Sequence, residues 1–149
     1  MPTKTEAAWT VDTNVLVYAT APDASAGPKR QAAQDLLSRL FQNPNGCLAG
    51  QVLGEYLSVV LRKKLMAPAI ALEAVNTWSQ ATRVLGASAL AYEQAWTLAA
   101  TRSYQVWDAL IISICAEHGV STLYSEDAGS LKRPLGVHVV NPFAGLDMP

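Results

Sequence analysis

The chain has 149 residues, 50% of them hydrophobic and 15% charged, and its formal net charge is −1. This length and apolar content fit one compact domain over residues 1–149 better than two domains or a disordered chain. No apolar run approaches the roughly 18 residues that would span a bilayer, so no membrane association is expected, and the near-zero charge by itself argues mildly against a nucleic-acid binder.

The first half of the chain alternates between apolar runs and helical patterns. The apolar stretches on both sides of a polar triplet at 12–14 predict one buried strand over 7–19, because continuous apolar runs mark strands that are covered on both faces. Apolar residues at helical spacing predict a helix over 30–41. A short strand over 47–49 and a helix over 51–65 follow a turn.

The second half continues this alternation. The predicted elements, in chain order, are a helix over 69–84, a short strand over 85–90, helices over 92–102 and 106–118, and strands over 121–124 and 137–140. Strands that alternate with helices predict an α/β fold with a central, mainly parallel sheet and helices on both of its faces.

The cysteines and histidines do not suggest a zinc site. Cys47 and Cys115 both lie in apolar stretches, where buried thiols of a reducing compartment are expected rather than a disulfide. His118 and His138 are the only histidines, and no paired C-x2-C or H-x3-H spacing is present. We therefore expect a cytoplasmic protein without zinc.

Four acidic residues lie at positions where a carboxylate requires a partner. Asp12 interrupts the apolar run of the first predicted strand, and Glu55 lies on the apolar side of its helix. Asp108 begins a strongly apolar helix, and Asp127 follows a predicted strand. Each of them taken singly also fits an ordinary cap, turn or amphipathic position.

Taken together, the four acids predict a metal site. Strand ends and the adjoining helix ends can meet at one edge of a parallel α/β sheet, where such folds place their ligands. Several carboxylates cannot all ionise side by side in a low-dielectric pocket without a cation, and an all-oxygen donor set suits Mg²⁺ or Mn²⁺. The predicted ligands and catalytic residues are Asp12, Glu55, Asp108 and Asp127.

The segments that contain these acids resemble the successive acidic motifs of PIN-domain nucleases. They are Val11–Ala19, Gln51–Tyr56, Trp107–Ile111 and Leu123–Asp127. The resemblance is closest to VapC-type toxins of bacterial toxin-antitoxin pairs, and it covers residues from about 9 to 143. The family shows Ser or Thr, any residue and then Asp in the last motif, which Ser125 and Asp127 match with Glu126 between them.

The resemblance implies a three-layer α/β/α sandwich and an endoribonuclease that requires Mg²⁺ or Mn²⁺. It also implies a homodimer and a cognate antitoxin that blocks the acidic site. Asn14 and Ser125 would then support the metal ligands, while Glu55 or Asp127 would orient or deprotonate the attacking water. Candidates for contacts with RNA phosphates come from one basic cluster, Arg62, Lys63 and Lys64.

Several other functions fit the residues less well. A haloacid-dehalogenase-type phosphotransferase needs a second Asp where Asn14 stands, and Cys115 with His118 fits core packing better than a hydrolase site. Trp107 and Tyr104 could stack on RNA bases, but we expect them to be core or interface residues. A domain with this fold that binds RNA or a protein without cleavage remains open, as does a nuclease that acts on DNA.

Overall fold

The computed structural model describes residues 7–22, 26–102, 104–127 and 134–146. Its central sheet has the strand order β3-β2-β1-β4-β5, and every strand pair within these residues is parallel. The strands are β1 (Ala8–Val11), β2 (Gly46–Ala49), β3 (Arg83–Leu85), β4 (Val120–Tyr124) and β5 (His138–Val140). The predicted α/β fold with a parallel sheet is confirmed.

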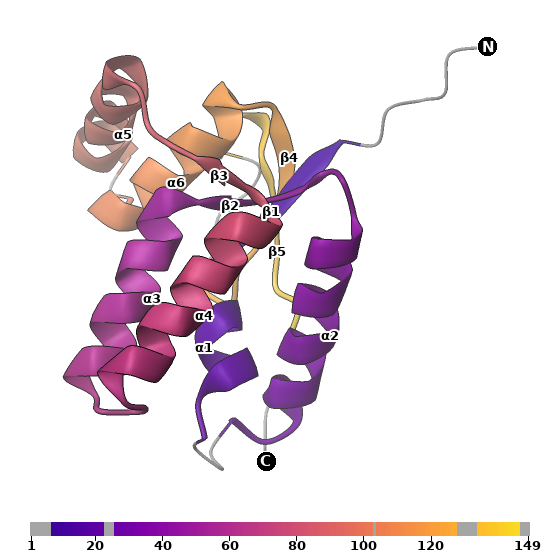
Figure 1. Ribbon diagram of the computed structural model, residues 1–149. Coiled ribbons are helices and arrows are strands. Elements are labelled where there is room, and N and C mark those ends of the chain that lie inside the picture. The colour runs from indigo at the N-terminus through magenta and orange to yellow at the C-terminus, as the bar shows by residue number, and fades with distance from the viewer. Residues whose placement is uncertain (1–6, 23–25, 103, 128–133, 147–149) are drawn as a thin grey trace.

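Helices cover both faces of this sheet. They are α1 (Thr13–Thr20), α2 (Pro28–Gln42), α3 (Gly50–Arg62), α4 (Pro68–Ala81), α5 (Ala89–Arg102) and α6 (Val106–Glu117). Figure 1 shows α1 to α4 on one side of the sheet and α5 with α6 on the other, which confirms the three-layer arrangement. None of the helices in the described ranges is long and apolar enough to cross a membrane.

The prediction of a single strand over 7–19 is wrong, because the chain turns into α1 after β1. Asp12 adopts an extended conformation, and its side chain accepts a hydrogen bond from the backbone N–H of Thr13, so Asp12 is the N-cap of α1. Val15, Leu16 and Ala19 are then buried on one side of a short helix. A short apolar run has no periodicity that separates a buried strand from a buried helix.

The predicted boundary between the 69–84 helix and the 85–90 strand is also wrong. Helix α4 ends at Ala81, β3 spans Arg83–Leu85, and α5 begins at Ala89. Thr82 is extended, and its hydroxyl donates to the carbonyl oxygen of Gly46 at 2.8 Å. The next residues pair with β2, with Arg83 opposite Cys47, and helical spacing could not predict this tertiary pairing.

The central strands and their neighbouring helices form the core. Val11, Leu48 and Leu123 contribute fully buried side chains from β1, β2 and β4, and Leu16 and Ile111 do so from α1 and α6. Each such side chain stabilises the fold by about 1.5–3 kcal/mol. Cys47 and Cys115 are buried free thiols, as predicted. Packing of these side chains holds β1 and β4 in place, and with them the residues that follow the two strands.

We predict that Gly46→Ala destabilises the protein, because β2 and α2 approach each other closely at this residue. A Cβ at position 46 would lie 2.4 Å from the backbone oxygen of Leu40, so the backbone would have to move, at a cost of about 1–3 kcal/mol. Gly54→Ala on α3 is the matched control: its Cβ would meet nothing within 4 Å, and it should stabilise the protein by about 0.5–1 kcal/mol. Urea unfolding of both variants measures these changes, and a neutral Gly46→Ala would show that the contact relaxes freely.

Candidate functional site

Asp12 lies at the centre of a polar site at the carboxyl ends of the strands. It directly follows β1 and is 8% exposed. Its Oδ1 accepts a hydrogen bond from the N–H of Thr13 at 2.8 Å, and its Oδ2 accepts one from the hydroxyl of Ser125 at 2.7 Å. Burial raises the pKa of Asp12, its two hydrogen bonds lower it, and the neighbouring carboxylates of Glu55 and Asp127 raise it again.

Ser125 brings the end of β4 to the same place. The N–H of Asp12 donates to the carbonyl oxygen of Tyr124 at 2.9 Å, and the N–H of Ser125 donates to that of Val140 at 2.9 Å. These bonds extend the pairing of β1, β4 and β5 past the strand ends. The site therefore lies where the strand order reverses around β1, the position at which open α/β sheets bind ligands.

Glu55 reaches the site from α3 and is held there by two side chains. Its Oε2 accepts a hydrogen bond from the Thr13 hydroxyl at 2.9 Å, and its Oε1 accepts one from Nε2 of Gln51 at 2.7 Å. The same Nε2 donates to the carbonyl oxygen of Trp107 at 2.9 Å, which connects α3 to α6. Thr13 and Gln51 thus orient Glu55, a role that no pattern in the sequence predicted for either residue.

Asp108 enters from the first turn of α6 and is half-buried. Burial raises its pKa to about 6, and the charges of Asp12, Asp127 and Glu55 contribute to the same shift. The fold therefore brings all four predicted acids to the lining of one cleft.

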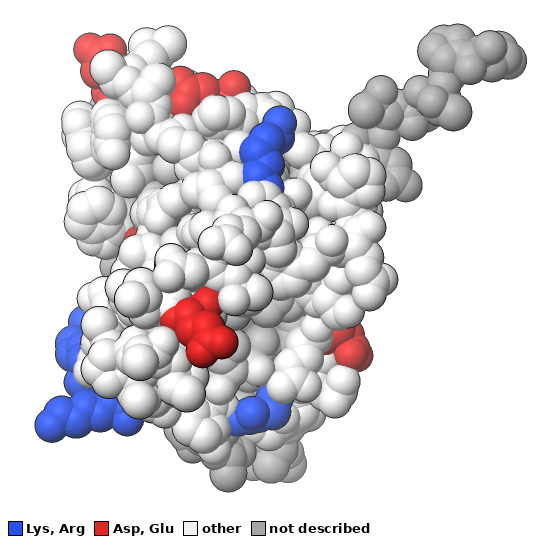
Figure 2. All heavy atoms as spheres, viewed as in Figure 1, with Lys and Arg blue, Asp and Glu red and all other residues white. Residues whose placement is uncertain are grey.

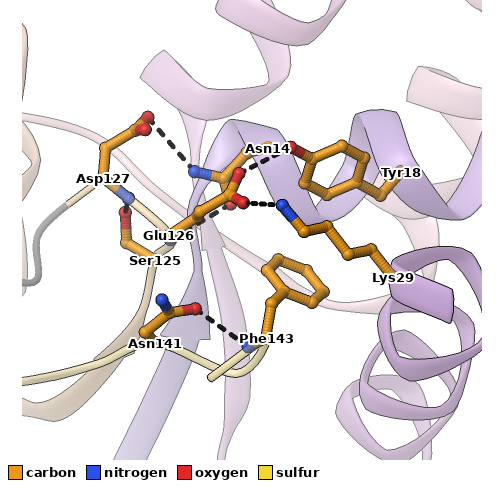
Figure 3. Close-up of polar contacts among 8 residues, drawn as sticks. All are labelled: Asn14, Tyr18, Lys29, Ser125, Glu126, Asp127, Asn141 and Phe143. Carbon is orange, nitrogen blue, oxygen red and sulfur yellow. Dashed lines mark hydrogen bonds and ion pairs between the residues drawn. The ribbon is translucent and has the colours of Figure 1, made fainter. Parts of the chain in front are cut away.

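The adjacent acids Glu126 and Asp127 point in different directions (Figure 3). Asp127 lies at the site, where its Oδ2 accepts a hydrogen bond from Nδ2 of Asn14 at 3.2 Å. Glu126 instead accepts a hydrogen bond from the Tyr18 hydroxyl at 2.6 Å and forms an ion pair with Lys29. The geometry therefore favours Asp127 over Glu126 as the acid of the last motif.

These groups surround a cleft of about 730 Å³. Its lining residues are Asp12, Thr13, Gln51, Gly54, Glu55, Ser58, Val59, Arg62, Gln105, Trp107, Asp108 and Asp127. Trp107 is 56% exposed, so of the two expected places, core and interface, the core is excluded for it, whereas Tyr104 does pack against the core. Of the predicted phosphate contacts, Arg62 is in this lining and Lys63 and Lys64 are exposed just beyond it.

A family model described as PIN domain matches residues 10–134. The chain belongs to the PIN domain family. The match covers most of the chain and includes all four acids, which confirms the resemblance seen in the sequence. No curated protein matches the chain significantly.

Solved structures of VapC toxins and toxin-antitoxin complexes share the fold of this PIN domain. VapC20 of Mycobacterium tuberculosis, a sarcin-ricin loop cleaving toxin, is 24% identical with a TM-score of 0.66, and the match covers 82% of this chain and 92% of that one. VapBC2 of Rickettsia felis, bound to a promoter DNA fragment, is 20% identical with a TM-score of 0.64 and coverages of 89% and 97%. A toxin-antitoxin complex of Klebsiella pneumoniae is 18% identical with a TM-score of 0.63 and coverages of 91% and 98%.

The donor set of this PIN domain fits a hard divalent cation. Within the described ranges, no group of three or more His, Cys, Asp or Glu side chains is arranged so that together they could hold a metal ion. Mg²⁺ does not require one, because it commonly binds one or two carboxylates directly and keeps several of its waters. Gln51 lines the cleft, and its Oε1 is a buried oxygen without a hydrogen-bond partner in the described part of the chain.

We predict that Asp108→Asn stabilises the metal-free protein at neutral pH. The raised pKa means that the folded state binds the Asp108 proton more tightly than the unfolded chain, so stability falls as the pH rises from 3.8 through about 6. Above that range the half-buried carboxylate costs on the order of 1 kcal/mol, which Asn removes. Urea unfolding in EDTA should show the gain at pH 7.5 and a smaller one near pH 4. An equal gain at both pH values would show that ionisation is not its cause.

Proposed function

We propose that this PIN domain is a divalent-metal-dependent endoribonuclease, the toxin of a type II toxin-antitoxin pair, which acts in the cytoplasm as a homodimer. The observation that carries the proposal is the convergence of four carboxylates on one cleft, from the residue after β1, from α3, from α6 and from the segment after β4. The similar structures support it, since one is described as a sarcin-ricin loop cleaving toxin and two are toxin-antitoxin complexes. The proposed partners are RNA and a cognate antitoxin that covers the cleft.

Asp12, Glu55, Asp108 and Asp127 are the proposed ligands of Mg²⁺ or Mn²⁺. When bound, the cation supplies charge neutralisation at the scissile phosphate and makes the attacking water more acidic. The chain's own groups fix the donors in advance: Thr13 and Ser125 hold Asp12, and Thr13 with Gln51 holds Glu55. Because these carboxylates are already oriented, little reorganisation is required when the substrate arrives.

The cleft also offers groups suited to a single-stranded RNA segment. Arg62 can contact a phosphate, and the exposed ring of Trp107 can stack on an unpaired base. Figure 2 shows basic side chains at the lower left, where α3 meets α4 in Figure 1 and where Arg62, Lys63 and Lys64 are exposed. This basic end of α3 offers a path for the RNA backbone beside the acidic centre.

We predict discrete cleavage of total cellular RNA by the purified chain with Mg²⁺ or Mn²⁺, and none with EDTA. Asp12→Asn should lower the cleavage rate more than about 100-fold, because it removes the carboxylate at the centre of the site. Asp35→Asn makes the same chemical change on the exposed face of α2 and should cleave like the unaltered chain. Gel analysis of the products measures the rates.

Two other outcomes of this assay would change the assignment. Intact RNA in the presence of a folded, metal-loaded protein would favour a PIN fold that binds RNA or a protein without cleavage. Cleavage confined to DNA substrates would favour a DNA-directed nuclease.

We further predict that Arg62→Gln weakens RNA binding more than it slows the chemical step. The KM for RNA should rise about three- to tenfold with little change in kcat. The slope of the logarithm of the binding constant against the logarithm of the salt concentration should become less steep by about one, as expected for the loss of one phosphate contact. Arg39→Gln is the matched control, because Arg39 lies beside Ser121 and Thr122 of β4, outside the lining of the acidic cleft. Equal effects of the two substitutions would mean that Arg62 acts only through net charge.

A further inference from the structure

Glu126 is the acid of the last motif that the proposed metal site does not use, yet two helices of the fold hold its side chain. Its Oε2 accepts the hydrogen bond from Tyr18 of α1 at 2.6 Å, and its Oε1 pairs with Nζ of Lys29 at the start of α2. The Lys29 Nζ also lies 5.3 Å from the centroid of the Tyr18 ring. We call Tyr18, Lys29 and Glu126 the Glu126 clamp; all of its members are labelled in Figure 3.

The clamp is shielded from solvent. The side chains of Lys29 and Glu126 are 20% and 22% exposed, and a partly buried, charge-assisted contact is stronger than an exposed ion pair. The ring of Tyr18 packs edge-on against Phe143, with ring centroids 5.1 Å apart, and Phe143 is 1% exposed. Burial raises the pKa of the Tyr18 phenol, and the hydrogen bond to Glu126 raises it further, so the phenol remains a donor at neutral pH.

A chain of hydrogen bonds connects the clamp to the proposed metal ligands. The N–H of Glu126 donates to Oδ1 of Asn14 at 3.5 Å, and Nδ2 of the same Asn14 donates to Asp127. The N–H of Asp127 donates to the hydroxyl of Ser125 at 3.3 Å, and this hydroxyl donates to Asp12. Asn14 and Tyr18 are one helical turn apart on α1, so one face of this helix contacts both members of the Glu126–Asp127 pair.

We propose that the Glu126 clamp is a positioning device for the metal site. It fixes segment 125–127 against α1 and α2 so that Glu126 points away from the cleft and Asp127 points into it. The inference rests on the proposed metal-dependent function. It assigns Lys29, Tyr18 and Glu126 to the orientation of a ligand rather than to contact with the metal or the RNA.

The sign of one substitution separates positioning from simple electrostatics. Lys29 is a cation near a site for cations, so if charge alone mattered, its removal would strengthen Mn²⁺ binding. If the clamp positions Asp127, the same removal releases Glu126 and weakens Mn²⁺ binding. Tyr18→Phe changes no charge and keeps the ring on Phe143, so it tests the hydrogen bond by itself.

The experiment is a Mn²⁺ titration of the RNA-free protein, in which electron paramagnetic resonance measures the concentration of free Mn²⁺ at each step. We expect Lys29→Met and Tyr18→Phe each to weaken binding by about tenfold, the usual effect of losing a group that orients a metal ligand. The matched control is Arg30→Met, which removes the same charge one residue along α2 but leaves the clamp intact; its affinity should be unchanged or slightly higher. Hydrogen exchange in EDTA should be faster across segment 125–127 in the two clamp variants only.

The possible failures can be told apart. Mn²⁺ binding by Lys29→Met that is as tight as, or tighter than, that of the unaltered chain would overturn the clamp. So would clamp variants that melt at lower temperature but bind Mn²⁺ normally while folded, because the contacts would then be merely structural. If the unaltered chain binds no Mn²⁺, the metal site of the proposed function is itself wrong. Tyr18→Phe keeps the test valid if Lys29→Met does not fold.

Discussion

The buried carboxylate of Asp12 is the constraint on which the rest of this site depends. An ionised group with 8% exposure at a strand end is costly unless hydrogen bonds or a cation compensate it. The N–H of Thr13 compensates part of this cost and begins α1, and the hydroxyl of Ser125 compensates another part and joins β4 to β1. The same two contacts therefore cap a helix, fix the strand ends and aim the carboxylate at the cleft. A single position thus connects the local fold to the chemistry.

Around Asp12 the protein concentrates negative charge, and the repulsion between these groups lowers the stability of the metal-free fold. Asp108 has a pKa raised to about 6, and Glu55 and Asp127 contribute to that shift, so the metal-free site stores electrostatic repulsion. The parallel strands and the apolar helix α6, whose residues from Ala109 to Cys115 are all buried, supply stability that tolerates this repulsion. A bound cation would relieve it, which couples metal binding to the stability of the fold. An arrangement that is poor for stability and good for binding is typical of functional sites.

Neutral side chains decide the directions of the charged ones. Thr13, Gln51, Asn14 and Ser125 each bond to a carboxylate, and Gln51 also joins α3 to α6. Glu126 is directed by one neutral and one charged side chain, because Tyr18 and Lys29 hold it away from its neighbour Asp127. Two consecutive acids thus take different roles from contacts that lie more than 90 residues away in the chain.

The sequence by itself determined the alternation of strands and helices, the parallel sheet and the four acids, because apolar periodicity and costly carboxylates are local properties. It could not separate a strand from a buried helix over Val15–Ala19, and it placed the strand expected over 85–90 too late in the chain, because the bounds of β3 follow from its pairing with β2. It left Glu126 beside Asp127 as an acid that could be mistaken for the ligand, gave no role to Gln51, and did not separate a core from an interface position for Trp107. Tertiary structure alone decided these points, since side-chain direction and exposure depend on partners brought together by packing, and no local pattern encodes those partners.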